Sequence, residues 1–302
     1  MNNKREKYRN MSVEERIELI EKLFIMHPSF ERCFNKIKEC HEHSKISKEP
    51  LCALKTGEPG VGKTTLCEKY EEAHPRVEED EKTRIPVLVL RIPIPATPKN
   101  MVTAFLTAMG DPLADKGTTY SKTLALFRLL KECEVEIIIL DEFHHIVDVD
   151  SDRVLYTVSD WLKQLINETK LPIVLVGLIY SVKILEANSQ LKRRFSMKDE
   201  LTNFEWIDPS KNGKSNTAND FRVFLKILDD ALPLAEDSHL ADQSIAFRMW
   251  KATEGNVNRT MKLVRYAAKS TLLNGDEKIT LKYLEKAYAM LFEDDSNENP
   301  FN

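Results

Sequence analysis

The eight residues from Gly57 to Thr64, Gly-Glu-Pro-Gly-Val-Gly-Lys-Thr, constrain the fold more than any other part of the chain. They fill every fixed position of the pattern G-x-x-x-x-G-K-[ST], after an apolar run and before a helical one. In that context the backbone N–H groups wrap phosphate groups, because glycine allows a positive φ and leaves no Cβ in the way. A turn beside an exposed lysine is the alternative. The pattern therefore predicts a strand, a phosphate-binding loop and a helix, in that order.

This loop assigns a role to each of its polar residues. Lys63 is expected to reach the β- and γ-phosphates of a nucleotide, and Thr64 to ligate Mg²⁺. The positive end of the following helix adds to anion binding. Only nine of the 302 residues are glycine, and three of them lie within this loop. The residues expected to contact the nucleotide are Gly57, Glu58, Pro59, Gly60, Val61, Gly62, Lys63, Thr64 and Thr65.

A second motif lies about 80 residues after Lys63, where an apolar run over 137–140 ends in Asp141 and Glu142. Asp141 suits the Mg²⁺ shell beside the nucleotide, and Glu142 suits the polarisation of an attacking water. Phosphoryl transfer asks the protein mainly for metal, charge and positioning. A strand that ends in two solvated acids is the alternative for this motif alone. Together the two motifs predict an ATPase with ATP and Mg²⁺ as its cofactors.

Short apolar runs alternate with longer amphipathic ones through the middle of the chain. Near-continuous apolar runs indicate strands that are covered on both faces, as in a parallel sheet wrapped by helices, so the predicted fold class is α/β. The runs expected to form strands are Leu51–Thr56, Pro86–Ile92, Glu136–Leu140, Pro172–Gly177 and Asn203–Ile207.

The pattern also predicts a division of the chain. Residues 1–49 form an N-terminal helical extension, in which Ser12–Glu15 has the spacing of a capping box. Residues 50–209 form the α/β core. Residues 210–293 form a helical lid, with helical periodicity over 221–231, 240–252, 257–273 and 281–292. The acidic tail, 294–302, is expected to be disordered.

Composition and charge exclude several classes of protein. The net charge of −4 does not fit a generally basic nucleic-acid binder, so any DNA contact must be a local patch. The most apolar long stretch, 171–182, is well short of the roughly 20 residues that span a bilayer. No secretory signal is visible, and five cysteines without a disulfide pattern favour a reducing cytosol. Cys33, Cys40, His41 and His43 lack a C-x-x-C pair, and a helix with half-buried cysteines explains them better than zinc does.

With both motifs in place, the chain resembles the AAA+ ATPases, which implies a P-loop AAA+ core and a helical lid. The position after the strand 172–177 usually carries a polar sensor residue in that family, but here it holds Leu178, and Tyr180 or Ser181 is the substitute. The segment 191–195 resembles the one that supplies an arginine finger to a neighbouring subunit, which makes Arg193 or Arg194 catalytic. The segment 253–259 resembles the second sensor, in which Arg259 contacts the γ-phosphate. A basic helix end and a surface arginine are the respective alternatives.

Two local details resemble the TniB/TnsC ATPases of transposons: Asp141–His145 as a D-E-x-H-H form, and the entry Met11–Arg16. The resemblance runs from about residue 11 to 292. It implies a homo-oligomer, as a ring or helical filament, that assembles on double-stranded DNA with ATP bound. It also implies partners, namely a transposase that is recruited and activated and a target-selector protein. ATP hydrolysis would then disassemble the oligomer in the bacterial cytosol or nucleoid.

Two segments match places where such proteins face the DNA backbone. Thr97 and Lys99 lie in one, and Lys116 and Thr118 in the other. Lysines and hydroxyls suit phosphate contacts, which give affinity without reading sequence, although ordinary polar loops explain them too. Two other functions stay open: a helicase-loader or initiator-like AAA+ ATPase, and a nucleotide-gated signalling switch that binds protein partners.

Overall fold

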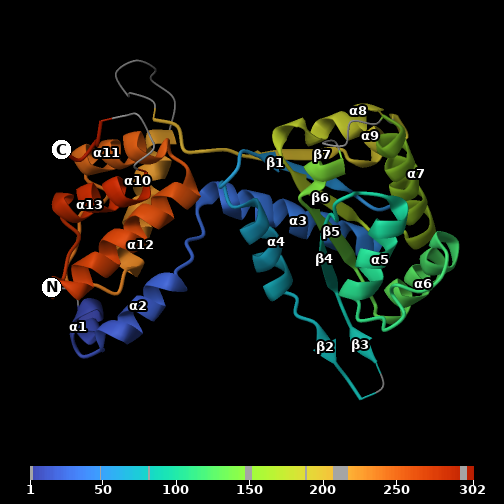
Figure 1. Ribbon diagram of the computed structural model, residues 1–302, viewed down its shortest axis with the longest axis horizontal. Coiled ribbons are helices and arrows are strands. Elements are labelled where there is room, and N and C mark those ends of the chain that lie inside the picture. The colour runs from blue at the N-terminus through green and yellow to red at the C-terminus, as the bar shows by residue number, and fades with distance from the viewer. Residues whose placement is uncertain are drawn as a thin grey trace. The chain divides into compact units, whose positions relative to one another are not determined.

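The computed structural model describes residues 3–47, 49–80, 82–146, 152–187, 189–206, 217–292 and 298–302. They form two compact units (Figure 1). The sheet unit is Ser29–Thr202. The helical unit is Met1–Pro28 together with Asn203–Asn302. No described helix is long and apolar enough to cross a membrane.

A five-stranded parallel sheet forms the centre of the sheet unit. Its strands are β1 (Ala53–Gly57), β4 (Val87–Arg91), β5 (Ile137–Asp141), β6 (Ile173–Gly177) and β7 (Met197–Leu201), in the order β4-β5-β6-β1-β7. A separate antiparallel pair consists of β2 (Val77–Glu78) and β3 (Thr83–Arg84). Parallel strands end at the same edge of a sheet, and β6 lies between β1 and β5. The phosphate loop after β1 and the acids after β5 therefore meet at one edge.

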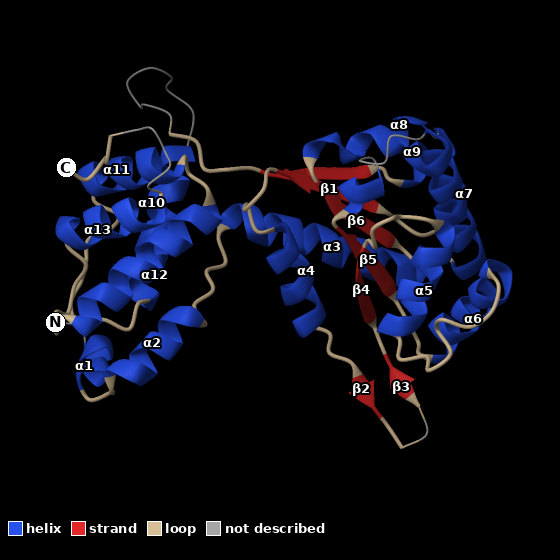
Figure 2. Cartoon of the chain, in the orientation of Figure 1, coloured by secondary structure: helices blue, strands red, loops and turns tan. Residues whose placement is uncertain are grey.

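Helices cover both faces of this sheet, with α3 and α4 on one face and α5, α6 and α7 on the other (Figure 2). All five residues of β5 and of β6 are buried, as their apolar sequences predict. The α/β class is thus confirmed. The helices of this unit are α3 (Pro28–Ile46), α4 (Lys63–Glu72), α5 (Pro98–Ala108), α6 (Thr119–Glu132), α7 (Asp152–Thr169), α8 (Lys183–Ala187) and α9 (Ser189–Arg194), with the short 3₁₀ helices η1 (Phe143–Ile146) and η2 (Ile179–Val182).

The fifth strand was predicted at the wrong place. The apolar run at Asn203–Ile207 was expected to form it, but the strand is Met197–Leu201, and the described part of that run is not a strand. The strand β7 lies at the edge of the sheet, where side chains are partly exposed and can be polar. Its sequence, Met-Lys-Asp-Glu-Leu, therefore lacks the apolar run by which the other strands were predicted. Phe204 instead packs in the core of the helical unit.

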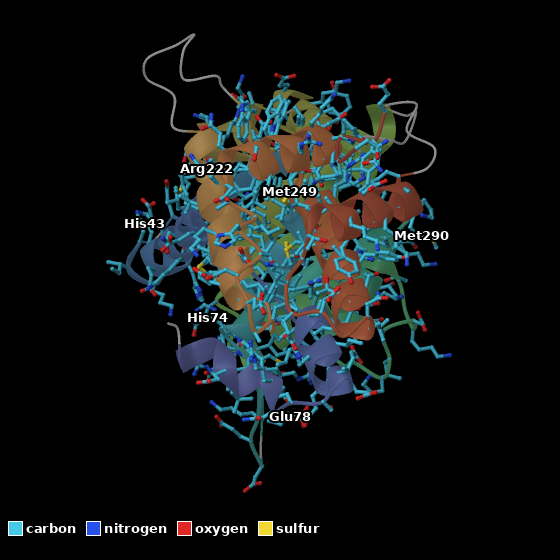
Figure 3. The ribbon with its side chains drawn as sticks, turned by 90° about the vertical axis from the view of Figure 1, so that its left-hand side faces the viewer. His43, His74, Glu78, Arg222, Met249 and Met290 are labelled. Carbon is cyan, nitrogen blue, oxygen red and sulfur yellow. The ribbon has the colours of Figure 1, made fainter. Side chains whose placement is uncertain are left out.

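Six described helices make up the helical unit: α1 (Asn3–Arg9), α2 (Val13–Glu21), α10 (Thr217–Ala231), α11 (Gln243–Thr253), α12 (Val257–Leu273) and α13 (Leu281–Leu291). The capping box of α2 is confirmed, because Ser12 Oγ accepts from Glu15 N and Glu15 Oε2 accepts from Ser12 N. The core includes Ile20 from α2 and Met249 from α11, both fully buried. Met249 is labelled in Figure 3.

The division into units differs from the predicted boundaries. The helix α2 was assigned to an extension of residues 1–49, yet it packs on α12, and Arg16 of α2 donates two hydrogen bonds to Glu277. The helix α3, assigned to the same extension, belongs to the sheet unit. Its residues Cys33, Ile37 and Cys40 are buried, and Cys33 Sγ donates to Asp199 Oδ2 of β7. The predicted boundary at 209–210 lies outside the described residues.

The expectation of a disordered tail over 294–302 is wrong for residues 298–302. Phe301 is 4% exposed and its ring lies 6.2 Å from that of Tyr288. Arg248 Nη1 donates to the carbonyl oxygens of Pro300 and Asn302. One aromatic residue and one arginine therefore anchor a segment whose composition is otherwise polar. Residues 294–297 lie outside the described residues.

Candidate nucleotide-binding site

The loop between β1 and α4 has the backbone that its glycines predict. Gly60 has φ 78° and Gly62 has φ 99°, a region that other L-residues rarely adopt. Gly57 pairs with Leu201 of β7, and a Cβ at Gly57 would clash with the carbonyl oxygen of Leu201. Gly62 is the N-cap of α4 and provides no side-chain cap. The first N–H groups of α4 are therefore left to an anionic ligand, as at other phosphate-binding helix ends.

Lys63 points back across this loop. Its Nζ donates to the carbonyl oxygens of Gly57 and Glu58, at 2.9 and 2.8 Å, and the residue is only 8% exposed. Burial lowers the pKa of Lys63, while the charges of Glu142 and Asp141 raise it in part. The loop thus holds an ammonium group against its own backbone, close to both acids. That is the cation which the phosphate-binding motif requires.

Thr64 and Asp141 meet across the sheet edge. Thr64 Oγ1 donates to Asp141 Oδ2 at 2.9 Å, and Asp141 is 3% exposed. The other carboxylate oxygen, Oδ1, accepts from the backbone N of Glu142 at 2.8 Å. A hydroxyl and a carboxylate oxygen in contact are hard oxygen donors, the kind that Mg²⁺ prefers. The residues that the sequence assigned to Mg²⁺ therefore fit that ion.

Glu142 turns the chain out of β5. It is not a glycine, yet its φ is 57°, and residues in such conformations often mark functional sites. Its Oε2 lies 3.3 Å from His144 Nε2 and 4.0 Å from His145 Nε2, and the two histidine rings are 4.3 Å apart. The carboxylate that was assigned to water activation thus lies beside two imidazoles. In the sequence, this histidine pair stood out only as part of the D-E-x-H-H form that resembles the TniB/TnsC ATPases.

The sensor position after β6 holds Leu178, as the sequence showed. Of the two predicted substitutes, Ser181 is fully buried, and its Oγ has no hydrogen-bond partner within the described part of the chain. A Cβ on Gly177 would lie 2.5 Å from Ser181 Oγ and 3.1 Å from His144 N. The other substitute, Tyr180, has its ring 6.0 Å from that of His144. Both substitutes therefore lie close to the turn that carries Glu142.

The two candidate finger arginines differ in their surroundings. Arg194 Nη2 donates to Asn167 Oδ1 of α7, whereas Arg193 is exposed. Both line a cavity of about 550 Å³ together with Gln190 and His43. Arg194 is thus engaged within its own chain, and Arg193 is the more accessible of the pair.

Arg259 belongs to the helical unit, in the first turn of α12. The N-cap Asn256 accepts from the backbone N of Arg259, and the guanidinium Cζ lies 4.4 Å from the ring centre of Phe292. Gly255, with φ 68°, precedes this turn, and a Cβ there would clash with the backbone of Phe204. The predicted turn into a new helix is confirmed, and the role of Arg259 as a sensor stays a prediction.

The four residues assigned to DNA fall at two helix starts. Thr97 caps α5 by accepting from Asn100 N, and Thr118 caps α6 by accepting from Ser121 N. Such caps typically contribute about 1 kcal/mol, which gives both threonines a structural role. Lys99 and Lys116 are exposed. The assignment to DNA contacts stays a prediction.

A family model described as "Bacterial TniB protein" matches residues 16–206. A comparison with curated protein sequences gave no match. Solved structures similar to this chain include the ORC1 protein of Aeropyrum pernix in complex with DNA (15% identity, TM-score 0.60, covering 89% of this chain and 67% of that one). They also include the ORC2 protein of Aeropyrum pernix in its ADPNP–ADP complexes (15%, 0.63, 90% and 71%) and Cdc6p from Pyrobaculum aerophilum (16%, 0.62, 89% and 69%). At these identities the likeness establishes the fold.

Proposed function

We propose a function for this chain on the premise that it belongs to the bacterial TniB family, whose model matches most of its length. The chain is a TniB/TnsC-type AAA+ protein. In our proposal it binds and hydrolyses ATP with Mg²⁺ and regulates DNA transposition. Copies with ATP bound assemble on duplex DNA and recruit and activate a transposase, and hydrolysis releases them. The contact of Thr64 with Asp141 beside Lys63 and Glu142 is the observation that carries the proposal.

The geometry supports a division of labour in hydrolysis. The loop N–H groups and Lys63 bind phosphate oxygens, and Thr64 and Asp141 present oxygens to Mg²⁺. Mg²⁺ held by these oxygens would supply positive charge that neutralises the phosphate groups. Glu142 follows Asp141 directly, so its carboxylate can accept a proton from a water aimed at the γ-phosphate. Ser181, a buried hydroxyl near that turn, orients the water in place of the missing sensor side chain.

Arginines complete the site in this proposal. Arg193 is the better finger because it is exposed, whereas Arg194 is bonded to Asn167. A finger supplied by another subunit typically raises the rate by about 10³–10⁵. Its delivery from a second copy would couple hydrolysis to assembly. Arg259 is the proposed second sensor, from the helical unit.

Contact with DNA rests on Lys99 and Lys116, since the two threonines already serve as helix caps. The similar ORC1 structure is described as a complex with DNA, which supports a DNA-associated function for this fold. Two lysines per copy give weak binding to a monomer of net charge −4 and strong binding to an oligomer, in which contacts accumulate.

The likeness to ORC1 and Cdc6p favours a second candidate, an initiator or helicase-loader-like ATPase. Both candidates predict ATP-dependent binding to DNA. They differ in the partner: only the first predicts that the ATP-bound protein stimulates strand transfer by a transposase from the same genetic element.

The Glu142→Gln variant tests the hydrolytic site. It should bind ATP as the wild type does and remain on duplex DNA longer, with hydrolysis slowed by about 10²–10⁴, the usual effect of a lost general base. Nucleotide binding by fluorescence, phosphate release and DNA dissociation report the three steps. Wild-type hydrolysis in this variant, or no ATP-dependent DNA binding by the wild type at low salt, would refute the proposal.

The double variant Lys99→Ala/Lys116→Ala tests the DNA contacts. Its affinity should fall alike on all sequences, and the slope of log K against log salt should shrink by about 1 for each lysine that contacts a phosphate. Lys38→Ala/Lys131→Ala is the matched control, because both lysines are exposed and the net charge changes equally. Equal behaviour of the two double variants would remove these loops from the DNA site.

A further inference from the structure

Three side chains at the end of β5 have metal-binding atoms close together. One oxygen of Glu142 and one ring nitrogen each of His144 and His145 all lie within 4.8 Å of one another. Among the described residues, no other group of three or more His, Cys, Asp or Glu side chains brings its ligand atoms this close together. Glu142 Oε2 is 3.3 Å from His144 Nε2, about the separation of two ligands bound to one ion at bond lengths near 2.0–2.2 Å.

The backbone presents this group as a unit. The carbonyl oxygen of Glu142 accepts from His145 N at 3.1 Å, which closes a 3₁₀ turn. Across this turn, Glu142 Oε2 and His145 Nε2 lie 4.0 Å apart. Phe143 and Ile146, both fully buried, fix the turn in the core. The three side chains are therefore held in place before any ion arrives.

The ligand chemistry selects a transition metal over Mg²⁺. Imidazole suits Zn²⁺, Fe²⁺, Ni²⁺ and Cu²⁺, and two histidines with one carboxylate form a ligand set of catalytic zinc and non-haem iron sites. Mg²⁺ prefers oxygen ligands alone, which Thr64 and Asp141 supply. The two kinds of ion thus have separate ligands, and they meet only through the adjacent residues Asp141 and Glu142.

The cysteines do not offer a better site for a soft dication. All five are buried, and burial raises the pKa of each thiol, to about 12 for Cys33 and Cys40. A thiol must lose its proton to bind a metal. Cys33 Sγ moreover donates to Asp199, and Cys40 Sγ contacts Met197 Sδ.

We propose that Glu142, His144 and His145 form a binding site for a divalent transition metal of the Zn²⁺ class, and that the bound metal inhibits ATP hydrolysis. The inhibition rests on the proposed function, since the metal holds the carboxylate that would otherwise accept the proton of the attacking water. The metal site itself does not depend on that function.

Metal binding is measured first, on chelator-treated protein without nucleotide. Titration with Co²⁺ should give visible absorption of a four- or five-coordinate ion at one equivalent, and calorimetry with Zn²⁺ should give one site. His145→Gln and Glu142→Gln should each weaken binding by at least about tenfold, the loss that even an outer partner of a metal ligand can cause. His43→Gln, which removes an exposed imidazole of the same unit, should bind as the wild type does.

Inhibition is measured next, as the rate of phosphate release with Mg²⁺ and ATP at rising Zn²⁺. The wild type and His43→Gln should lose activity at the Zn²⁺ concentration that fills the site, and His145→Gln should need at least about tenfold more. Unchanged Zn²⁺ affinity in both ligand variants would overturn the site, and full activity with the site filled would overturn the inhibition. A protein without ATPase activity would refute the proposed function, while the Co²⁺ spectra would still decide the site.

Discussion

Lys55, next to the phosphate loop, has a buried ammonium group, and the variant Asp199→Ala removes the carboxylate beside it. Lys55 of β1 is fully buried, and its Nζ lies 3.4 Å from Asp199 Oδ2 of β7. Lys36 Nζ lies 3.0 Å from the other oxygen, Oδ1, and Cys33 Sγ donates to Oδ2 at 3.2 Å. Burial lowers the pKa of Lys55, and the charge of Asp199 raises it in part. One carboxylate therefore stabilises the charge of Lys55 and ties β7 to β1 and α3.

The expected loss follows from these burials. Removing one partner of a buried ion pair typically costs about 3–5 kcal/mol, and we expect the lower end because Asp199 is 12% exposed. Lys55→Met/Asp199→Ala should recover most of that loss, since an apolar pair of similar volume is often as stable as the buried ions. Lys36→Met, which removes a one-third-exposed cation from the same carboxylate, should cost about 1 kcal/mol or less.

Urea unfolding followed by fluorescence measures these losses. Trp161 is the only tryptophan in residues 29–202, so a background with phenylalanine at Trp206 and Trp250 reports the sheet unit. In Asp199→Ala the pKa of Lys55 falls further, and the unfolded chain binds a proton that the folded chain lacks. Its stability should therefore rise with pH towards 10.5, the ordinary pKa of a lysine. A loss below about 1 kcal/mol at neutral pH, or no recovery in the double variant, would refute the reasoning.

Three further predictions concern the phosphate loop, a carboxylate among basic side chains and the C-terminal segment 298–302. Gly57→Ala should destabilise the sheet unit more than Gly62→Ala in urea unfolding, because a Cβ at Gly57 clashes with the Leu201 carbonyl. A Cβ at Gly62 meets no atom of the described residues within 4 Å, so that variant costs only the strain of its positive φ, about 1–2 kcal/mol. The reverse order of stability would contradict the clash. Burial raises the pKa of Glu136, but hydrogen bonds from neighbouring lysine, histidine and arginine side chains outweigh it and hold that pKa at about 2. The stability from Glu136 should thus be present above pH 4.5 and lost as the pH falls towards 2, and Glu136→Gln should lose this dependence in acid unfolding curves. Phe301→Ala should lower the stability of the helical unit by about 3 kcal/mol in thermal unfolding, and an unchanged midpoint would mean that the chain end does not anchor there.

Local motifs made much of the candidate site predictable. A phosphate loop is one continuous segment whose glycines, lysine and threonine act within a few residues, so its sequence specifies its geometry. The run 137–142 carries its own signal too, because a strand buried on both faces is apolar until it reaches the edge where its acids emerge. The histidines beside Glu142 follow in the same segment. Their E-x-H-H spacing directly after a buried strand was a sequence signal that could have predicted a metal-binding site there.

Edge strands and end contacts carried no comparable signal. The strand β7 is polar and half-exposed, and its place depends on Lys55 of β1 and Lys36 of α3, which lie far away in the sequence. The caps that Thr97 and Thr118 form on α5 and α6 also escaped the sequence analysis, which assigned these threonines to DNA contacts, an assignment that stays a prediction.

The sequence by itself determined the α/β class, the phosphate loop and the acids after β5, because short-range patterns encode burial, turns and helix starts. The tertiary structure alone decided that α2 joins the C-terminal helices, that Phe301 is buried, and that Arg194 is bound by Asn167 while Arg193 is exposed. Each of these depends on which surfaces meet after the chain has folded, and a pairing between distant residues leaves no periodicity in a single sequence.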